Sequence, residues 1–194
     1  LITLGNVCKE YFPLATRIVG GNLATTMYQE LFEDGAAEVF DAFCFGEGEL
    51  PLLELFEAKN VCEYLEKSPS WITASKSSGG YLFAHNFINE LDDIPALDYE
   101  LLDLSDYQLS PTIKAYTQIN DKTNYITYMT SRGCPFLCTF CSAHTVHGRK
   151  MRYFSVDRIE KELTALQKTY SANTLVLEDD HFLSDNKRAK TIIG

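Results

Sequence analysis

Three cysteines lie within eight residues of this chain, at Cys134, Cys138 and Cys141. The C-x3-C-x2-C spacing puts three thiolates on one short loop, where each can hold one iron of a four-iron, four-sulfur cluster. Such a cluster normally takes four cysteines, so three of them leave one iron without a protein ligand. An open position on a metal is where a substrate or cosubstrate can bind. The spacing therefore predicts a reactive iron–sulfur site.

Zinc and disulfides are the competing interpretations of the cysteines. His144 and His147 could complete a zinc site, but zinc ligands usually form two pairs separated by a dozen or more residues, and no second pair follows here. The other cysteines, Cys8, Cys44 and Cys62, are scattered through apolar or helical surroundings. We expect these three to be ordinary buried thiols, because the chain has no signal peptide and is too large to need disulfides. A reducing, cytoplasmic setting fits all six cysteines.

The cysteine motif and its flanks resemble the start of a radical S-adenosylmethionine (SAM) enzyme. The matching run is SRGCPFLCTFC at 131–141, and the resemblance extends through GRKMRYFS at 148–155 and EDDHFLSD at 178–185. These flanks are similar to the subgroup that carries a cobalamin-binding domain before the radical SAM domain. The resemblance implies that SAM binds the open iron and that one electron from the cluster cleaves SAM to a 5′-deoxyadenosyl radical. It also implies an electron donor such as flavodoxin or ferredoxin, and a small-molecule or peptide substrate.

Two sets of residues are candidates for holding SAM. Many radical SAM enzymes hold the methionine amino group with a Gly-Gly-Glu stretch after the second strand, where this chain has Glu178, Asp179 and Asp180. A carboxylate there could pair with the SAM ammonium group, although capping of the next helix is an equal alternative. Phe136 and Phe140 could shield the cluster or contact adenine, and core packing is the alternative for both.

The cysteine loop and the carboxylates follow elements that should bring them together. Residues 125–130 are rich in aromatic and β-branched types and predict a strand, and 174–177 predict a second strand. Between them, apolar residues recur at helical spacing over 156–170, with Ser155 as the N-cap. The resemblance implies a partial (β/α) barrel, of which 125–194 would hold about two units of roughly thirty residues. Because active residues gather at the carboxyl ends of barrel strands, we expect the cysteines and the carboxylates to face one cavity.

Residues 1–62 predict alternating strands and helices, which favours a parallel sheet in an α/β fold. Short strands are expected at 17–19 and within 39–45. A helix is expected at 23–32 with Leu23, Met27 and Leu31 as its apolar stripe, and another opens near Pro51.

This first block resembles the second half of a cobalamin-binding Rossmann-like domain, through VGGN at 19–22 and FGEGE at 45–49. In that family paired glycines lie near the nucleotide tail of the cofactor, so Gly20 and Gly21 are the candidates here. Glycine lets a backbone approach a ligand closely, and a simple turn is the alternative. The Asp-x-His-x-x-Gly stretch that supplies a histidine to cobalt in that family does not occur in this chain. Cobalamin is therefore a candidate cofactor that the sequence leaves open.

Residues 63–124 predict a connector. Segments 71–73 and 81–83 flank SSGG at 77–80, which predicts a hairpin. The acidic run at 91–98 favours a solvated linker over a metal site. The resulting domains are 1–62, the second half of a cobalamin-binding-type domain; 63–124, a connector with a hairpin; and 125–194, the start of a radical SAM domain.

Composition and charge exclude some classes of partner. The chain has 194 residues, of which 45% are hydrophobic and 23% charged, as in an ordinary globular protein. No apolar run is long enough to cross a bilayer, and a net charge of −10 disfavours nucleic acid as a partner. Both ends look cut, since the chain starts at Leu1 and stops at Gly194 just after a helix begins. We expect an excerpt of a longer protein that is inactive alone, because two barrel units cannot enclose SAM.

The leading functional hypothesis is a radical SAM methyltransferase or ring-forming enzyme. One alternative is a methylthiotransferase, whose N-terminal domain holds a second cluster on three cysteines. Cys8, Cys44 and Cys62 match that number but lack the expected local contexts. The other alternative is a noncatalytic zinc or iron–sulfur binding module.

Overall fold

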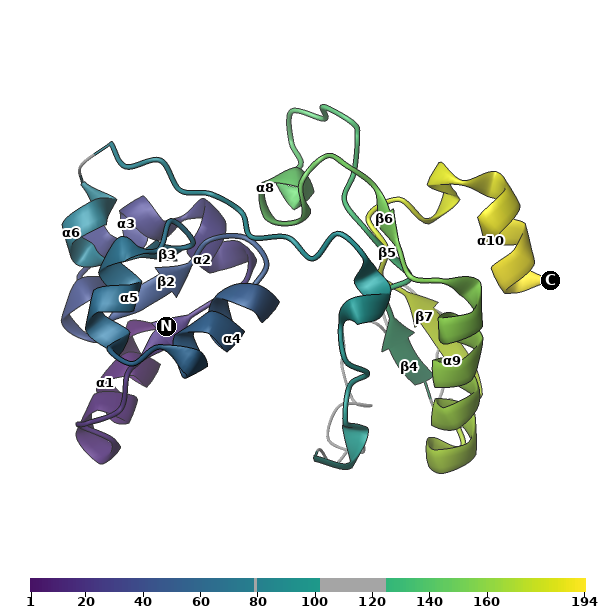
Figure 1. Cartoon of the computed structure of the whole chain (residues 1–194), viewed down its shortest axis with the longest axis horizontal. Coiled ribbons are helices and arrows are strands. Elements are labelled where there is room, and N and C mark those ends of the chain that lie inside the picture. The colour runs from purple at the N-terminus through teal and green to yellow at the C-terminus, as the bar shows by residue number, and fades with distance from the viewer. Residues whose placement is uncertain (79, 102–124) are drawn as a thin grey trace. The chain divides into compact units, whose positions relative to one another are not determined.

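The computed structural model describes residues 1–78, 80–101 and 125–194 of the chain (Figure 1). It has two compact units. Unit 1 comprises Leu1–Asn89 and Gly133–Lys150, and unit 2 comprises Glu90–Arg132 and Met151–Gly194. Unit 1 combines helices with one small sheet and unit 2 combines them with two strand pairs, so the predicted α/β class is confirmed.

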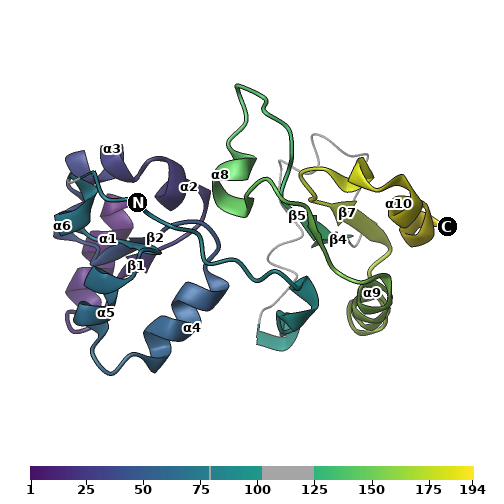
Figure 2. The same ribbon diagram turned by 45° about the horizontal axis from the view of Figure 1, so that its top comes forward.

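Unit 1 is built on a sheet of three short strands in the order β1-β2-β3 (Figures 1 and 2). β1 (Ile18–Val19) pairs in parallel with β2 (Ala42–Cys44), which matches the strands predicted in both segments. β3 (Trp71–Ile72) adds to the other side of β2 in the antiparallel direction. The surrounding helical elements are α1 (Ile2–Tyr11), α2 (Asn22–Thr26), α3 (Tyr28–Glu33), η1 (Ala36–Glu38), α4 (Glu49–Glu57), α5 (Val61–Lys67), α6 (Ala74–Ser77) and α8 (Ala143–His147).

Helices cover both faces of this sheet. Successive side chains of a strand point to opposite faces, so Phe43 packs with residues of α1, α2 and α3. Its neighbours Ala42 and Cys44 pack on the other face with Leu55 of α4 and Leu65 of α5. Unit 1 is therefore a three-layer arrangement with a well-buried middle layer.

The helix predicted at 23–32 is wrong in two respects. It is broken at Met27 into α2 and α3, and both Leu23 and Met27 of the predicted apolar stripe are 44% exposed. The hydroxyls of Thr25 and Thr26 donate to carbonyls four residues earlier, a pattern that bends helices. The side that turns inward carries Ala24 and Thr25 instead.

The hairpin predicted in the connector is also not formed. β3 pairs with β2 rather than with residues 81–83, which carry no strand in the described chain. The serine-rich segment between them begins as the short helix α6. The compact units divide the chain at other points than the predicted domains, whose boundaries stay a prediction. Residues 102–124 of the predicted connector lie outside the described residues.

Unit 2 contains a parallel pair and an antiparallel pair of strands. β4 (Tyr125–Tyr128) pairs in parallel with β7 (Thr174–Leu177), and β5 (Ser131–Arg132) pairs with β6 (Arg152–Tyr153). The helix α9 (Val156–Tyr170) connects β6 to β7 and is seen nearly end-on in Figure 2, beside the β4–β7 pair. The remaining helical elements are η2 (Leu91–Asp93), η3 (Tyr99–Leu101), η5 (Phe182–Ser184) and α10 (Asn186–Ile193).

The predicted strands and helix of unit 2 are confirmed. α9 begins after Ser155, whose hydroxyl accepts the backbone N–H of Arg158 as an N-cap should. Ile159 and Leu166 of its apolar stripe are buried against Ile126 and Tyr128 of β4. In the described part of the chain, no helix has the length and apolar character that crossing a membrane requires.

Candidate metal and cofactor site

The cysteine loop, residues 133–142, lies in unit 1 just before α8. All three of its thiols are free; Cys134 is half-buried, whereas Cys138 and Cys141 are exposed. Within the described chain, this loop forms neither helix nor strand. No three Cys, His, Asp or Glu side chains among the described residues converge on a point where they could hold an ion.

The donor set nevertheless fits an iron–sulfur cluster in its chemistry. Thiolates are the ligands that such clusters take, and the three thiols are free and close together in the sequence. Because two of them are exposed on a loop outside the regular elements, the sulfurs can turn toward a common centre when a cluster binds. The metal ligands themselves stay a prediction.

Backbone hydrogen bonds shape both parts of the loop. Cys134 donates its N–H to the carbonyl of Gly148 (3.2 Å), and Cys141 donates to the carbonyl of Cys138 (3.2 Å). Gly133 has φ +93°, and a Cβ at this position would lie 2.3 Å from the carbonyl oxygen of Lys150. Only glycine fits there, because any other residue would combine an unfavourable φ with a backbone clash.

The aromatic side chains of the loop are not packed in a core. Phe136 is 55% exposed, Leu137 73% and Phe140 90%. Core packing, the alternative for Phe136 and Phe140, is therefore wrong in the structure. The loop that carries the three thiols therefore also exposes three large apolar side chains.

One of the three predicted carboxylates has partners in the protein. Asp179 follows β7 in unit 2 and accepts hydrogen bonds from the Thr130 backbone N–H (3.0 Å), the Thr130 hydroxyl (2.8 Å) and the Ser131 hydroxyl. Thr130 and Ser131 are almost fully buried. Glu178 and Asp180 are exposed. The carboxylate of Asp179 thus ties the end of β7 to the start of β5.

A half-buried arginine completes this polar network. Arg188 of α10 donates to the Thr130 carbonyl (2.7 Å) and to the Phe154 carbonyl (3.3 Å), and its guanidinium lies 4.9 Å from the centre of the Tyr153 ring. Burial lowers the pKa of Arg188, and the charge of Asp179 opposes that shift. Asp179 and Arg188 therefore both bind Thr130, which lies just before the cysteine loop.

The cysteines and the carboxylates fall in different units. The cysteine loop belongs to unit 1, and Glu178, Asp179 and Asp180 belong to unit 2. The expectation that they face one cavity stays a prediction.

The paired glycines lie where the sequence placed them, directly after β1. Both Gly20 and Gly21 are exposed. Gly21 has φ +87° as the N-cap of α2, and a Cβ built on it meets nothing within 4 Å. Its backbone conformation accounts for the glycine, and the open space beside it leaves room for a ligand. Cobalamin binding at these glycines stays a prediction.

The scattered cysteines do not form a second metal site. Cys8, Cys44 and Cys62 lie on α1, β2 and α5, and they do not converge in the described structure. Burial, and to a smaller extent the charge of Glu49, raises the pKa of Cys44 to about 12, so this thiol is inert. The expectation that all three are buried is wrong for Cys62, which is exposed.

The acidic linker contributes a structural contact. The carboxylate of Asp92 accepts the backbone N–H of Ser155 (2.9 Å), and Arg158 donates to the Asp92 carbonyl (2.8 Å). Hydrogen bonding to the side chain and then the backbone of Ser155, with the nearby charge of Arg158, lowers the pKa of Asp92. Asp92 is therefore more than part of a solvated linker, because it helps to hold the start of α9.

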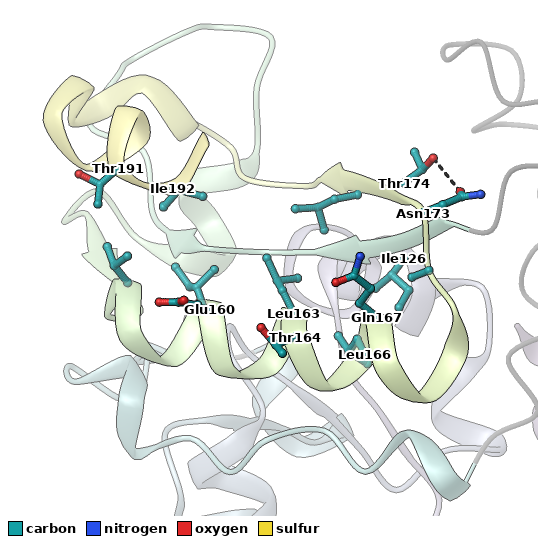
Figure 3. Close-up of a pocket in the computed structure, with 14 residues that line it drawn as sticks. Ile126, Glu160, Leu163, Thr164, Leu166, Gln167, Asn173, Thr174, Thr191 and Ile192 are labelled. Carbon is teal, nitrogen blue, oxygen red and sulfur yellow. Dashed lines mark hydrogen bonds between the residues drawn. The ribbon is translucent and has the colours of Figure 1, made fainter. Parts of the chain in front are cut away.

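A cavity of about 520 Å³ lies between α9, α10 and the β4–β7 pair (Figure 3). Its wall mixes apolar side chains, such as Ile126, Leu163 and Ile192, with polar ones, such as Glu160 and Gln167. It contains none of the cysteines or predicted carboxylates. The sequence analysis did not predict it, and its lining is that of a packing groove between a helix and a sheet.

Three residues near the site, Glu47, Thr130 and Arg188, were not predicted from the sequence as contributors to it, and neither was the contact of His147 with Glu47. His147 on α8 lies 2.8 Å from a carboxylate oxygen of Glu47, which is 100 residues away in the chain. The Thr130 and Arg188 contacts span 58 residues. No local pattern marks such pairs, so only a structure could find them.

Comparisons with known proteins point to enzymes. No family model matches the chain. An uncharacterized methyltransferase of Pyrococcus horikoshii is 32% identical over 152 residues, which cover 77% of this chain and 30% of that protein. The hopanoid C-3 methylase of Methylococcus capsulatus is 28% identical over 169 residues, covering 87% of this chain and 30% of the methylase. The anaerobic magnesium-protoporphyrin IX monomethyl ester cyclase of Cereibacter sphaeroides is 23% identical over 184 residues, covering 94% of this chain and 28% of the cyclase.

The chain is thus similar to methylases and a cyclase along most of its own length. It spans less than a third of the length of each of these relatives.

Proposed function

We propose that this chain is part of a radical SAM enzyme of the subgroup with an N-terminal cobalamin-binding-type domain. The enzyme would use a four-iron, four-sulfur cluster on Cys134, Cys138 and Cys141. The observation that carries the proposal is three free thiols on one largely exposed loop, in a chain similar to methylases and a cyclase. When bound, the cluster would supply the electron that cleaves SAM to a 5′-deoxyadenosyl radical.

The fold supports this proposal in both units. The helix-covered sheet of unit 1 is what the second half of a Rossmann-like domain requires, with β1 and β2 parallel. In unit 2, β4 and β7 are parallel, and α9 packs against β4 as the helix of a (β/α) unit does. The finer assignment is a cobalamin-binding-type half-domain at 1–62, a connector at 63–124 and the first units of a partial barrel from 125.

The surroundings of the candidate SAM residues support different roles for them. The carboxylate of Asp179 accepts hydrogen bonds from Thr130 and Ser131, so we assign Asp179 to positioning of this backbone segment. Glu178 and Asp180 are exposed and are the better candidates for the SAM ammonium group, because a carboxylate binds it with a charge-assisted hydrogen bond. Phe140, 90% exposed beside Cys141, is the candidate for stacking on adenine.

The reaction would be methyl transfer, ring formation or a related step on a small-molecule or peptide substrate. Hydrogen abstraction by the 5′-deoxyadenosyl radical would start it. An electron donor such as flavodoxin or ferredoxin, in a reducing cytoplasm, would reduce the cluster. Cobalamin at Gly20 and Gly21 is a further candidate cofactor for the methyl-transfer case.

Neither alternative function gains support from the structure. A second cluster on Cys8, Cys44 and Cys62 would need the buried, high-pKa thiol of Cys44 and residues fixed on three different elements. A zinc site that used Nδ1 of His147 would break its contact with Glu47.

The test is product analysis with the whole protein that contains this chain. After anaerobic reconstitution and reduction, incubation with SAM should release 5′-deoxyadenosine, and S-adenosylhomocysteine as well if methyl transfer occurs. Cys134→Ala, Cys138→Ala and Cys141→Ala should each release neither product. A wild-type protein with an intact cluster that leaves SAM unchanged would contradict the enzymatic proposal.

A further inference from the structure

A buried carboxylate of the unit 1 sheet contacts the helix that follows the cysteine loop. Glu47 lies in the turn after β2, and its side chain is only 2% exposed. Its Oε1 is 2.8 Å from Nδ1 of His147, the last residue of α8. An ionised carboxylate only accepts hydrogen bonds, so this contact with an ionised Glu47 requires the tautomer of His147 that has its proton on Nδ1. A buried acid with this partner gives a directed contact between the sheet and α8.

The turn that presents Glu47 is itself fixed. Gly46 has φ +81° and donates its N–H to the hydroxyl of the buried Thr25 (3.0 Å). A Cβ at Gly46 would lie 2.3 Å from Nδ1 of His85. The His85 ring packs against Phe45, with a centroid distance of 4.8 Å. The backbone on which Glu47 sits is therefore set by a glycine-only conformation and by close packing.

A second contact holds the residue next to His147. Gly148, at φ +71°, packs against the ring of Phe87, since a Cβ there would lie 3.0 Å from two of the ring carbons. Phe87 in turn stacks on His85, with a centroid distance of 4.7 Å and an interplanar angle of 11°. The carbonyl of Gly148 accepts the N–H of Cys134 at 3.2 Å. Fixing His147 and Gly148 thus fixes the backbone of the first cysteine, because that hydrogen bond joins the start of the loop to the residue that follows α8.

We propose that Glu47 is a positioning residue for the cysteine loop, and that the turn at 45–49 which presents it serves the cluster. Through His147 and Gly148, it sets where the Cys134 backbone stands, while the exposed tip from Phe136 to Cys141 stays able to close around the iron. The sheet of unit 1 is then a scaffold for the cluster, whether or not it holds a cobalamin. This inference rests on the proposed iron–sulfur function of the loop.

The test compares four variants of the whole protein, each also in its cluster-free form. Glu47→Ala removes the contact, and Glu47→Gln keeps an oxygen that can accept from His147. His147→Ala removes the same contact from the more exposed side, so the inference stays testable if Glu47→Ala does not fold. Glu57→Ala, an exposed carboxylate at the end of α4, is the control for loss of one negative charge.

Two readouts separate this inference from the proposed function. In the cluster-free protein, hydrogen exchange of the amides of α8 and of Cys134 should be about tenfold faster in Glu47→Ala and His147→Ala, which corresponds to ~1.4 kcal/mol. Glu47→Gln and Glu57→Ala should exchange like the wild type. After reconstitution, Glu47→Ala and His147→Ala should have a shifted cluster midpoint potential or EPR line shape. Glu47→Gln should have the wild-type values.

Unchanged exchange in both Glu47→Ala and His147→Ala would overturn the positioning role. So would unchanged potential and EPR spectra in variants that take up iron normally. Failure of the wild type to bind iron would instead overturn the proposed function, and the exchange data from the cluster-free protein would still decide whether Glu47 holds the loop.

Discussion

Three adjacent acids at the end of β7 differ in what their carboxylates contact. Asp179 accepts three hydrogen bonds from Thr130 and Ser131, whereas Glu178 and Asp180 are exposed to solvent. Residue type alone made the three equivalent candidates for the SAM ammonium group. Their surroundings assign one to holding the chain and leave two for a ligand.

This difference predicts effects of very different size for two neighbouring substitutions. Asp179→Ala should lower the free energy of unfolding by roughly 2–4 kcal/mol, because it leaves buried donors on Thr130 and Ser131 without their acceptor. Asp180→Ala should change it by less than about 0.5 kcal/mol, as expected for an exposed side chain. Chemical denaturation of the two variants and the wild type measures both values. Equal stabilities of the two variants would contradict the assignment of Asp179 to positioning.

At the scale of elements, α9 is held at its start by side chains from two parts of the chain. Ser155 caps its first turn, and Asp92 accepts the N–H of Ser155 itself. Arg158 and Glu162 form an ion pair one turn apart (2.7 Å), and Glu162 also accepts from the Tyr128 hydroxyl (2.6 Å). The helix is thereby fastened to the linker and to β4.

The N-cap gives a direct prediction for this helix. Ser155→Ala should destabilise unit 2 by about 1 kcal/mol, because the N–H of Arg158 loses its acceptor. Ser142, the N-cap residue of α8, makes no side-chain capping bond and is the matched control. Thermal unfolding of the cluster-free protein should show a clear loss for Ser155→Ala and almost none for Ser142→Ala. An equal loss of thermal stability in both variants would contradict a stabilising role for the Ser155 cap.

Elements with strong local signals were predictable from the sequence. α9 combines a serine cap with a regular apolar stripe, and β4 and β7 are short apolar runs of strand-forming residues. The broken helix at Met27 and the missing hairpin had no such signal. The first depends on threonine hydroxyls that bond back to the helix, and the second on β2 offering Trp71 a better strand partner than residues 81–83.

At the scale of the whole molecule, the segments on either side of the cysteine loop are held by partners that are remote in the sequence. Asp179 and Thr130 are 49 residues apart, and Glu47 and His147 are 100 apart. The sequence indicated which residues could ligate metal, since thiol spacing is a local property. It could not indicate what holds the loop, because these contacts depend on how distant segments pack. The described strands also form separate sheets in the two units.

The central claim is that the cysteine loop carries an iron–sulfur cluster to which SAM binds. The most direct measurement is the EPR spectrum of the reconstituted, reduced whole protein, recorded before and after SAM is added. We predict a cluster signal from about four irons per chain that changes on adding SAM. It should be lost in Cys134→Ala, Cys138→Ala and Cys141→Ala and kept in Cys62→Ala, an exposed cysteine outside the loop. Stoichiometric zinc without iron, or a cluster signal that SAM leaves unchanged, would contradict the claim.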